Sequence, residues 1–174
     1  MPDAGGPFNP VELLGVLVEH EVDFILIGGL AATIHGSPFA TVDVDIVPRR
    51  ERSNLEHLSD ALRAVGAHVY VSAQETLSFE HDGASLSDAA VWNLATTFGG
   101  LDITYVPAGT SGYTDLAERA QAIDIGGISV RVAALEDIIR SKEAANREKD
   151  RVVLPALRRL LERSGEHRNE APKT

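Results

Sequence analysis

Two aspartates in a short alternating segment are the residues best suited to chemistry in this sequence. In residues 42–47, Asp43 and Asp45 alternate with valine and isoleucine, and this period of two predicts a β-strand with both carboxylates on one face. Like charges at that separation repel each other unless a cation lies between them. Mg²⁺ or Mn²⁺ takes oxygen ligands and also binds phosphate oxygens. The pattern indicates metal-dependent phosphate chemistry, with a polar strand face open to water as the simpler alternative.

A pair of glycines precedes these aspartates and offers a place for an anion. Residues 23–27 form a short apolar run typical of a buried strand, and Gly28 and Gly29 follow it directly. Residues 30–35 are small and apolar and predict a short helix. Backbone N–H groups at such a strand-to-helix turn can approach a phosphate. A tight turn also needs glycine, so it is the spacing to the aspartates that favours a phosphate-binding role.

The segment from Phe24 to Pro48 resembles, in a minimal form, the nucleotidyltransferase fold of the DNA polymerase β type. Its order of strand, glycine pair, short helix and TxDxD is similar to that of AbiEii-type and MenT-like toxin nucleotidyltransferases. Residues 132–150, VAALEDIIRSKEAANREKD, match the second block of that family, a helix with a lysine followed by a Lys-Asp pair. The resemblance covers residues 24–161, with a looser match in the middle.

This resemblance implies a set of catalytic residues. Asp43 and Asp45 match the metal-binding pair, and Asp102, in a Leu-Asp-Ile context, matches the third carboxylate, as metal ligand or general base. Lys142 matches the lysine that contacts the nucleotide phosphates, and Asp150 matches the aspartate that orients it. The residues expected to bind the nucleotide are Gly28, Gly29, Thr41, Lys142 and Arg147.

One position departs from the family pattern. A basic residue often precedes TxDxD, whereas here Phe39 and Ala40 occupy that place, and we expect Arg147 or Lys149 to supply the charge instead. Lys142 itself lies on the apolar stripe of its predicted helix. Its ammonium group is therefore expected either to face the site or to extend along the stripe to solvent.

Composition limits the other classes of function. The chain has 174 residues, no cysteine, and 26 acidic against 16 basic side chains, so disulfides and thiolate zinc sites are excluded. The net charge of -10 argues against a general polyanion-binding surface. However, residues 140–163 hold eight Lys or Arg and four Asp or Glu, which predicts one basic face able to position an RNA end. With no apolar run of about 20 residues and no signal peptide, we expect a cytoplasmic protein without membrane contact.

The order of predicted elements favours an α+β, or mixed α/β, fold. Helices are predicted at 10–19, 52–65 and from 134 onward, strands at 68–71 and 76–80, and hairpins at 91–106 and 123–132. We expect a single domain over residues 1–174, whose nucleotidyltransferase core, residues 8–132, is a central mixed sheet flanked by helices. Residues 133–163 are expected to be C-terminal helices that complete the active site, and residues 164–174 a disordered tail.

The predicted function is Mg²⁺-dependent transfer of a nucleoside monophosphate from an NTP to an acceptor hydroxyl. The resemblance implies a tRNA 3′ end as acceptor and the role of toxin in a toxin–antitoxin pair. It also implies a cognate antitoxin, which as a kinase would act near Thr41. Two alternatives stay open. The chain is either an antitoxin of the same fold that adenylylates a partner toxin protein, or a non-catalytic member that binds a partner.

Overall fold

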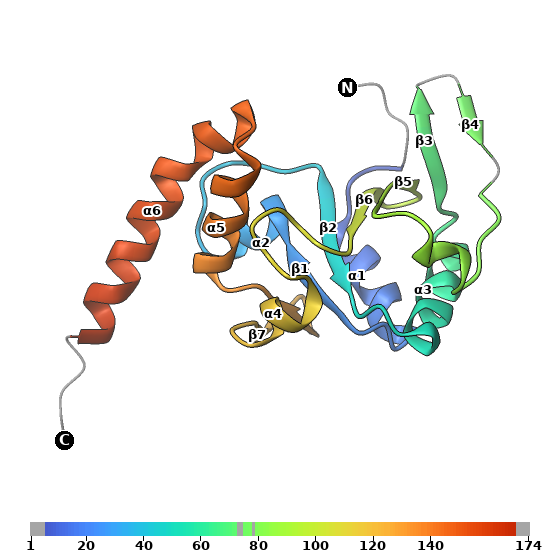
Figure 1. Ribbon diagram of the computed structural model, residues 1–174, viewed down its shortest axis with the longest axis horizontal. Helices are drawn as coiled ribbons and strands as arrows, with labels where there is room; N and C mark the ends of the chain where they lie inside the picture. The colour runs from blue at the N-terminus through green and yellow to red at the C-terminus, as the bar shows by residue number, and fades with distance from the viewer. Residues whose placement is uncertain (1–5, 73–74, 78, 170–174) are drawn as a thin grey trace.

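The computed structural model describes residues 6–72, 75–77 and 79–169, and these residues form one eight-stranded sheet (Figure 1). The strands are β1 (Phe24–Ile27), β2 (Asp43–Pro48), β3 (His68–Ser72), β4 (Glu75–Leu77), β5 (Val91–Thr96), β6 (Gly99–Thr104), β7 (Gln121–Ile125) and β8 (Ile128–Val132). Their order in space is β4-β3-β5-β6-β2-β1-β8-β7. The β1–β8 and β2–β6 pairs are parallel and the others antiparallel, which confirms the predicted mixed sheet.

Helices flank this sheet on both faces. They are α1 (Pro10–Glu19), α2 (Gly28–Ile34), α3 (Arg52–Ala64), α4 (Tyr113–Ala117), α5 (Leu135–Ala145) and α6 (Glu148–Asn169), with a 3₁₀ turn η1 (Ser85–Ser87). The start of α1 follows from its sequence, because Pro10 is the first helical residue and the Asn9 side chain accepts a hydrogen bond from the Glu12 N–H at 3.3 Å. At the other end of the chain, Asn146 adopts a left-handed conformation that ends α5 and turns the chain into α6.

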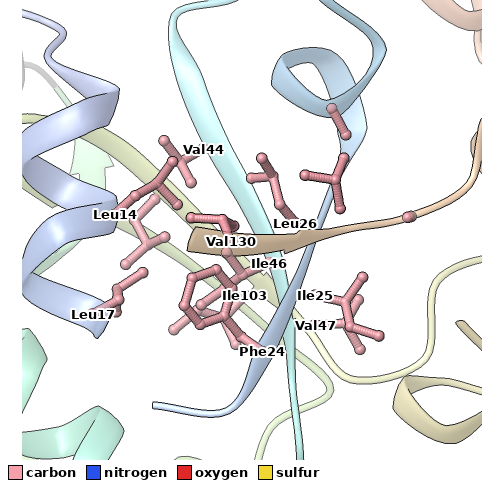
Figure 2. Close-up of a cluster of buried hydrophobic side chains, with 14 of the residues drawn as sticks. Leu14, Leu17, Phe24, Ile25, Leu26, Val44, Ile46, Val47, Ile103 and Val130 are labelled. Atoms are coloured by element: carbon pink, nitrogen blue, oxygen red, sulfur yellow. The ribbon is translucent and has the colours of Figure 1, made fainter. Parts of the chain in front are cut away.

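The hydrophobic core lies between one face of the sheet and helices α1 and α3. Figure 2 shows the cluster around the central strands, with side chains that include Leu14, Leu17, Phe24, Val44, Ile46, Ile103 and Val130. Val44 and Ile46 of β2 are fully buried, and each such side chain contributes roughly 1.5–3 kcal/mol to folding. Because strand side chains alternate, burial of Val44 and Ile46 on this face directs Asp43 and Asp45 to the opposite one.

The opposite face is only partly covered. Helix α2 packs against β1 and β2, α4 packs against β1, and α5 packs against α2 and α6. In Figure 1, α6 lies beside α5 at one side of the molecule and the β3–β4 hairpin lies at the other side. On β5, Val91 is 45% exposed and Asn93 is exposed. The sheet therefore has an open area next to the helices.

The structure corrects several predicted boundaries. Helix α6 continues to Asn169, where a disordered tail from residue 164 was expected, and the Ser164 hydroxyl donates to the Leu160 carbonyl within this helix. Residues 170–174 lie outside the described residues. Helix α2 begins at Gly28, two positions before the predicted start, and β4 ends at Leu77. Helix α4 and η1 were not predicted. No helix in the described part of the chain is both long enough and apolar enough to span a membrane.

Candidate active site

Four neighbouring strands each place one residue in a row across the open face of the sheet. Ile27 of β1 pairs with Asp45 of β2, and Asp45 pairs with Asp102 of β6. Asp102 in turn pairs with Asn93 of β5. Asp45 and Asp102, which are far apart in the sequence, are thus lateral neighbours on adjacent parallel strands. The sheet register itself brings the two predicted carboxylates together.

Asp43 lies one step along β2 from this row, on the same face as Asp45. Its strand partner is Gly100, where an added Cβ would lie 3.3 Å from the Cβ of Asp43. The Thr41 hydroxyl donates a hydrogen bond to Oδ1 of Asp43 at 2.6 Å and fixes the orientation of that carboxylate. Thr41 precedes β2, so its role here is to hold Asp43 and not to extend the strand.

The two glycines make room for this arrangement. Gly28 has φ of +71°, and a Cβ at this position would lie 2.0 Å from Oδ2 of Asp45. A Cβ on Gly29 would lie 2.8 Å from the hydroxyl oxygen of Thr41, and the Gly29 backbone N–H hydrogen bonds to Asp45. Close approach of the strand carboxylates therefore requires glycine at both positions, in addition to any contact with phosphate.

The two carboxylates of the row, Asp45 and Asp102, have pKa values above that of an ordinary aspartate. Burial raises the pKa of Asp45 to about 7, and the negative charges of Asp43 and Asp102 add to this effect. Burial also raises the pKa of Asp102 to about 6, together with the charge of Asp43, although Lys149 and Arg147 act in the opposite direction. The sheet side of the site thus holds more negative charge than its protein neighbours balance.

The corner between α5 and α6 holds a second cluster. Asp150 is fully buried; its Oδ1 lies 3.3 Å from Nζ of Lys142, and its Oδ2 accepts a 2.7 Å hydrogen bond from Nε of Arg147. The Arg147 backbone N–H also donates to Asp150. Burial alone would raise the pKa of Asp150, but the hydrogen bond from Arg147 and the charge of Lys142 outweigh it and lower that pKa. The side chain of Lys142 is only 14% exposed, so of the two orientations expected from the sequence it takes the inward one.

A cavity of about 370 Å³ separates the row from this corner. Its lining includes Gly28, Asp45, Asp102, Lys142 and Arg147, so five of the residues predicted from sequence share one space. The other four predicted site residues adjoin it without lining it: Gly29, Thr41, Asp43 and Asp150. The rest of the lining comes mainly from α5, from Val91 and Asn93 of β5, and from segment 104–110 at and after the end of β6.

The donor atoms at the row suit a hard cation. The facing groups are carboxylates, without a thiolate or an imidazole, and they lack balancing charge, as Mg²⁺ sites do. Within the described residues, no group of three or more His, Cys, Asp or Glu side chains is arranged so that it could hold a metal ion by itself. A cation here would take its remaining ligands from phosphate oxygens and water.

Sequence reasoning missed several residues of the cavity. Asn93 and Thr104 lie on its sheet wall, and the alternation of the predicted hairpin relative to Asp102 was a signal for both. Asp137 at the start of α5 is fully buried and pairs with Arg119 and Arg140. The pairs of Arg119 with Asp137 and of Arg140 with Asp115 tie α5 to α4 and the segment after it, and so help to position Lys142, whereas the Asp137–Arg140 pair lies within α5. No local pattern indicates the two long-range pairs.

No family model matches the chain, and no curated protein sequence matches it. Solved structures do. A Thermotoga maritima protein assigned as a nucleotidyltransferase has a TM-score of 0.51 and 15% identity, over 91% of this chain and 97% of that one. The lincosamide antibiotic adenylyltransferase LnuA, in its lincomycin-bound form, has a TM-score of 0.58 and 14% identity, over 87% of this chain and 95% of that one.

This protein has a nucleotidyltransferase fold. In this nucleotidyltransferase fold, the row crosses β1, β2, β6 and β5, its two carboxylates lie on β2 and β6, and Lys142 lies across the cavity on α5. The mixed α/β nucleotidyltransferase fold expected from the sequence is thereby confirmed.

Proposed function

We propose that this protein transfers a nucleoside monophosphate from an NTP to an acceptor hydroxyl, with Mg²⁺ or Mn²⁺ as cofactor. One observation carries the proposal. Asp45 and Asp102 lie side by side on a cavity wall, with Asp43 close by and the ammonium group of Lys142 across the same cavity. The excess of negative charge on the sheet side suits a divalent cation, and the fixed positive charge of Lys142 suits phosphate oxygens. A metal-bound triphosphate supplies both.

Each charged residue has a defined part in this proposal. Asp43, Asp45 and Asp102 would hold the divalent cation, which when bound neutralises them and polarises the phosphate oxygens. Lys142 and Arg147 would contact phosphate oxygens from the helical side. Asp150 hydrogen bonds to the side chains of Lys142 and Arg147 and holds them in place, so we assign it a positioning role.

The reaction balances with the groups present. The acceptor hydroxyl oxygen forms a bond to the α-phosphorus of the NTP, and the bond between that phosphorus and the α–β bridging oxygen breaks, which releases pyrophosphate. Asp102 accepts the hydroxyl proton.

A tRNA 3′ end is the acceptor that we propose. The first turn of α6 carries an exposed basic residue, Lys149, which is close enough to lower the pKa of Asp102. The phosphodiester on the 5′ side of the terminal nucleoside would find positive charge there. Growth arrest as a toxin, with a cognate antitoxin, fits such an acceptor. A phosphate on Thr41 would remove the donor to Asp43 and add negative charge, which suits control by an antitoxin kinase.

The test is transfer of label from each α-labelled NTP to total tRNA, to a protein extract, or to a panel of small hydroxylated compounds that includes lincomycin. Labelled tRNA is expected. Asp45→Asn should reduce transfer roughly 100- to 1,000-fold, because removal of a metal ligand costs several kcal/mol of transition-state stabilisation. Asp88→Asn replaces an exposed carboxylate outside the cavity and serves as the matched control.

The class of molecule that receives the label distinguishes the alternative functions. Labelled protein would support the antitoxin that adenylylates a partner, and a labelled small compound would move the acceptor to that class. If no NTP binds in the presence of Mg²⁺, the protein is a non-catalytic, partner-binding member of the fold. Equal labelling by wild type and Asp45→Asn would overturn the site assignment.

A further inference from the structure

The open part of the sheet next to Asp102 has a composition of its own. Asn93 of β5 is the direct cross-strand partner of Asp102, and Val91 is the partner of Thr104. Cross-strand partners have Cβ atoms about 5 Å apart. Val106 follows β6 at the cavity mouth. We call Val91, Asn93, Thr104 and Val106 the β5–β6 strip; all four line the cavity on the side of Asp102 away from Gly28.

The polar side chains of the strip have unused hydrogen-bonding capacity. Among the residues that the structure describes, the Asn93 amide and the Thr104 hydroxyl have no hydrogen-bond partner. An amide offers two donors and an acceptor, and a hydroxyl offers one donor with its lone pairs. Both face the cavity within one strand step of the carboxylate that takes the proton. They are placed to orient a group whose hydroxyl lies at Asp102.

The apolar side chains of the strip are unusually open. Val91 is 45% exposed and Val106 is 59% exposed, and they lie at the same end of the strip. A flat ring that packs against them would remove apolar surface from water. The strip therefore combines hydrogen-bonding groups near the reacting position with apolar contacts farther out.

The strip carries no charge. Lys142 and Arg147, on the opposite wall, are engaged by Asp150. Lys149 of α6 is exposed, has no ion pair within the described residues, and is close enough to influence Asp102. A phosphodiester would gain nothing on the strip itself but would be attracted to Lys149. This distribution of charge favours an uncharged terminal group of the acceptor on the β5–β6 strip and a phosphate group next to Lys149.

We propose that the β5–β6 strip is the acceptor subsite and holds the terminal nucleoside of the acceptor RNA, with its ribose hydroxyl at Asp102. This inference rests on the proposed function. Asn93 and Thr104 hydrogen bond the nucleoside, Val91 and Val106 pack against its base, and Lys149 contacts the adjoining phosphate. The strip sets acceptor specificity, whereas NTP binding depends on the residues of the other half of the cavity.

Two substitutions test this subsite with steady-state kinetics on the full chain, with tRNA as acceptor. Thr104→Val removes the hydroxyl and keeps the shape, and Asn93→Ala removes the amide. Each should raise KM for tRNA about 10-fold, the effect of one lost hydrogen bond, and leave KM for the NTP unchanged. Thr104→Ser, which keeps the hydroxyl, should restore most of the affinity. A purely structural role would move both KM values together.

Matched controls come from exposed positions outside the cavity lining. Thr114→Val on α4 and Gln121→Ala on β7 remove the same groups and should change neither KM. A free nucleoside is expected to inhibit competitively against tRNA and not against the NTP. Equal kinetics for wild type, Thr104→Val and Asn93→Ala would overturn the subsite, as would labelling of protein or of a small compound in place of RNA.

Direct NTP binding distinguishes the two levels of failure. If wild type binds a labelled NTP in Mg²⁺ and transfers it to RNA, yet the strip variants behave as wild type, the subsite is wrong and the proposed function stands. If wild type binds no NTP, the proposed function itself fails and the subsite falls with it.

Discussion

The two walls of the cavity treat buried carboxylates in opposite ways. On the sheet wall, burial and mutual repulsion raise the pKa of Asp45 to about 7 and that of Asp102 to about 6. On the helical wall, Asp150 has a fully buried side chain, yet its pKa is lowered because Arg147 and Lys142 bond to it. Burial alone therefore does not set the protonation state. The number of donors and cations that reach the carboxylate decides it.

This contrast separates a part of the site whose charges are paired within the protein from a part whose charges are not. The helical wall has its charges paired in the free protein, so its geometry is fixed before any substrate arrives. The sheet wall holds repulsive carboxylates in the folded state, which costs folding free energy that a bound cation would restore. We therefore expect that replacing a carboxylate with a neutral side chain destabilises the folded protein on the helical wall and stabilises it on the sheet wall.

Substitution of Asp150 should have the largest effect on stability. Asp150→Ala leaves the largely buried side chain of Lys142 without its partner, and we expect the free energy of unfolding to fall by roughly 3 kcal/mol. Asp45→Asn should instead stabilise the metal-free protein at neutral pH, because it removes a repelled charge. Urea unfolding in the presence of a chelator measures both. Destabilisation of similar size by the two variants would contradict the contrast between the walls.

The pH dependence of stability should come from the sheet wall. Between about pH 5 and about pH 8 the unfolded chain has ionised aspartates, whereas the folded protein still binds protons at Asp45 and Asp102. The native state holds more protons in this window, so the free energy of unfolding falls as pH rises. We expect a loss of about 2 kcal/mol, since solvent screening reduces the full effect of the shifts.

The comparison with Asp45→Asn isolates this dependence. His81, whose pKa is lowered by burial, contributes in the opposite direction in both proteins, so it cancels in the difference between them. The stabilisation from the lowered pKa of Asp150 is fully present above its unfolded value and is lost only in acid, outside this window. Mg²⁺ should stabilise the wild type more at the high end of the window. A pH-independent difference between wild type and Asp45→Asn would contradict the prediction.

The smallest expected effect comes from the residue that holds Asp43. Thr41→Val removes the hydroxyl that donates to Oδ1 of Asp43 and should weaken Mg²⁺ or Mn²⁺ binding about 10-fold, as loss of an outer-shell contact does. Thr41→Ser keeps the hydroxyl and should bind the cation as wild type does. Calorimetric titration with Mn²⁺ gives the affinities. If Thr41→Val and Thr41→Ser bind Mn²⁺ with equal affinity, the hydrogen bond from Thr41 to Asp43 does not contribute to cation binding.

The elements of the fold follow closely from local pattern. Alternation around Asp43 and Asp45 predicted the strand and its polar face, and a helix was predicted over residues 10–19, both of which the structure confirms. Local sequence pattern did not predict elements whose burial depends on distant parts of the chain. Helix α6 extends through residues 164–169, although Ser164 and Gly165 are typical of a helix end. The five-residue helix α4 has too few positions to show a period.

The sequence alone determined which residues are able to do chemistry, because TxDxD, the glycine pair and the lysine helix each depend on neighbours within a few positions. Only the tertiary structure decided how their charges act. Sheet register placed Asp45 against Asp102 and Asn93 beyond it, and the corner of α5 and α6 enclosed Asp150 with its cations. The pKa of a carboxylate depends on charges and solvent within a few ångströms, and those neighbours come from segments that only the folded chain brings together.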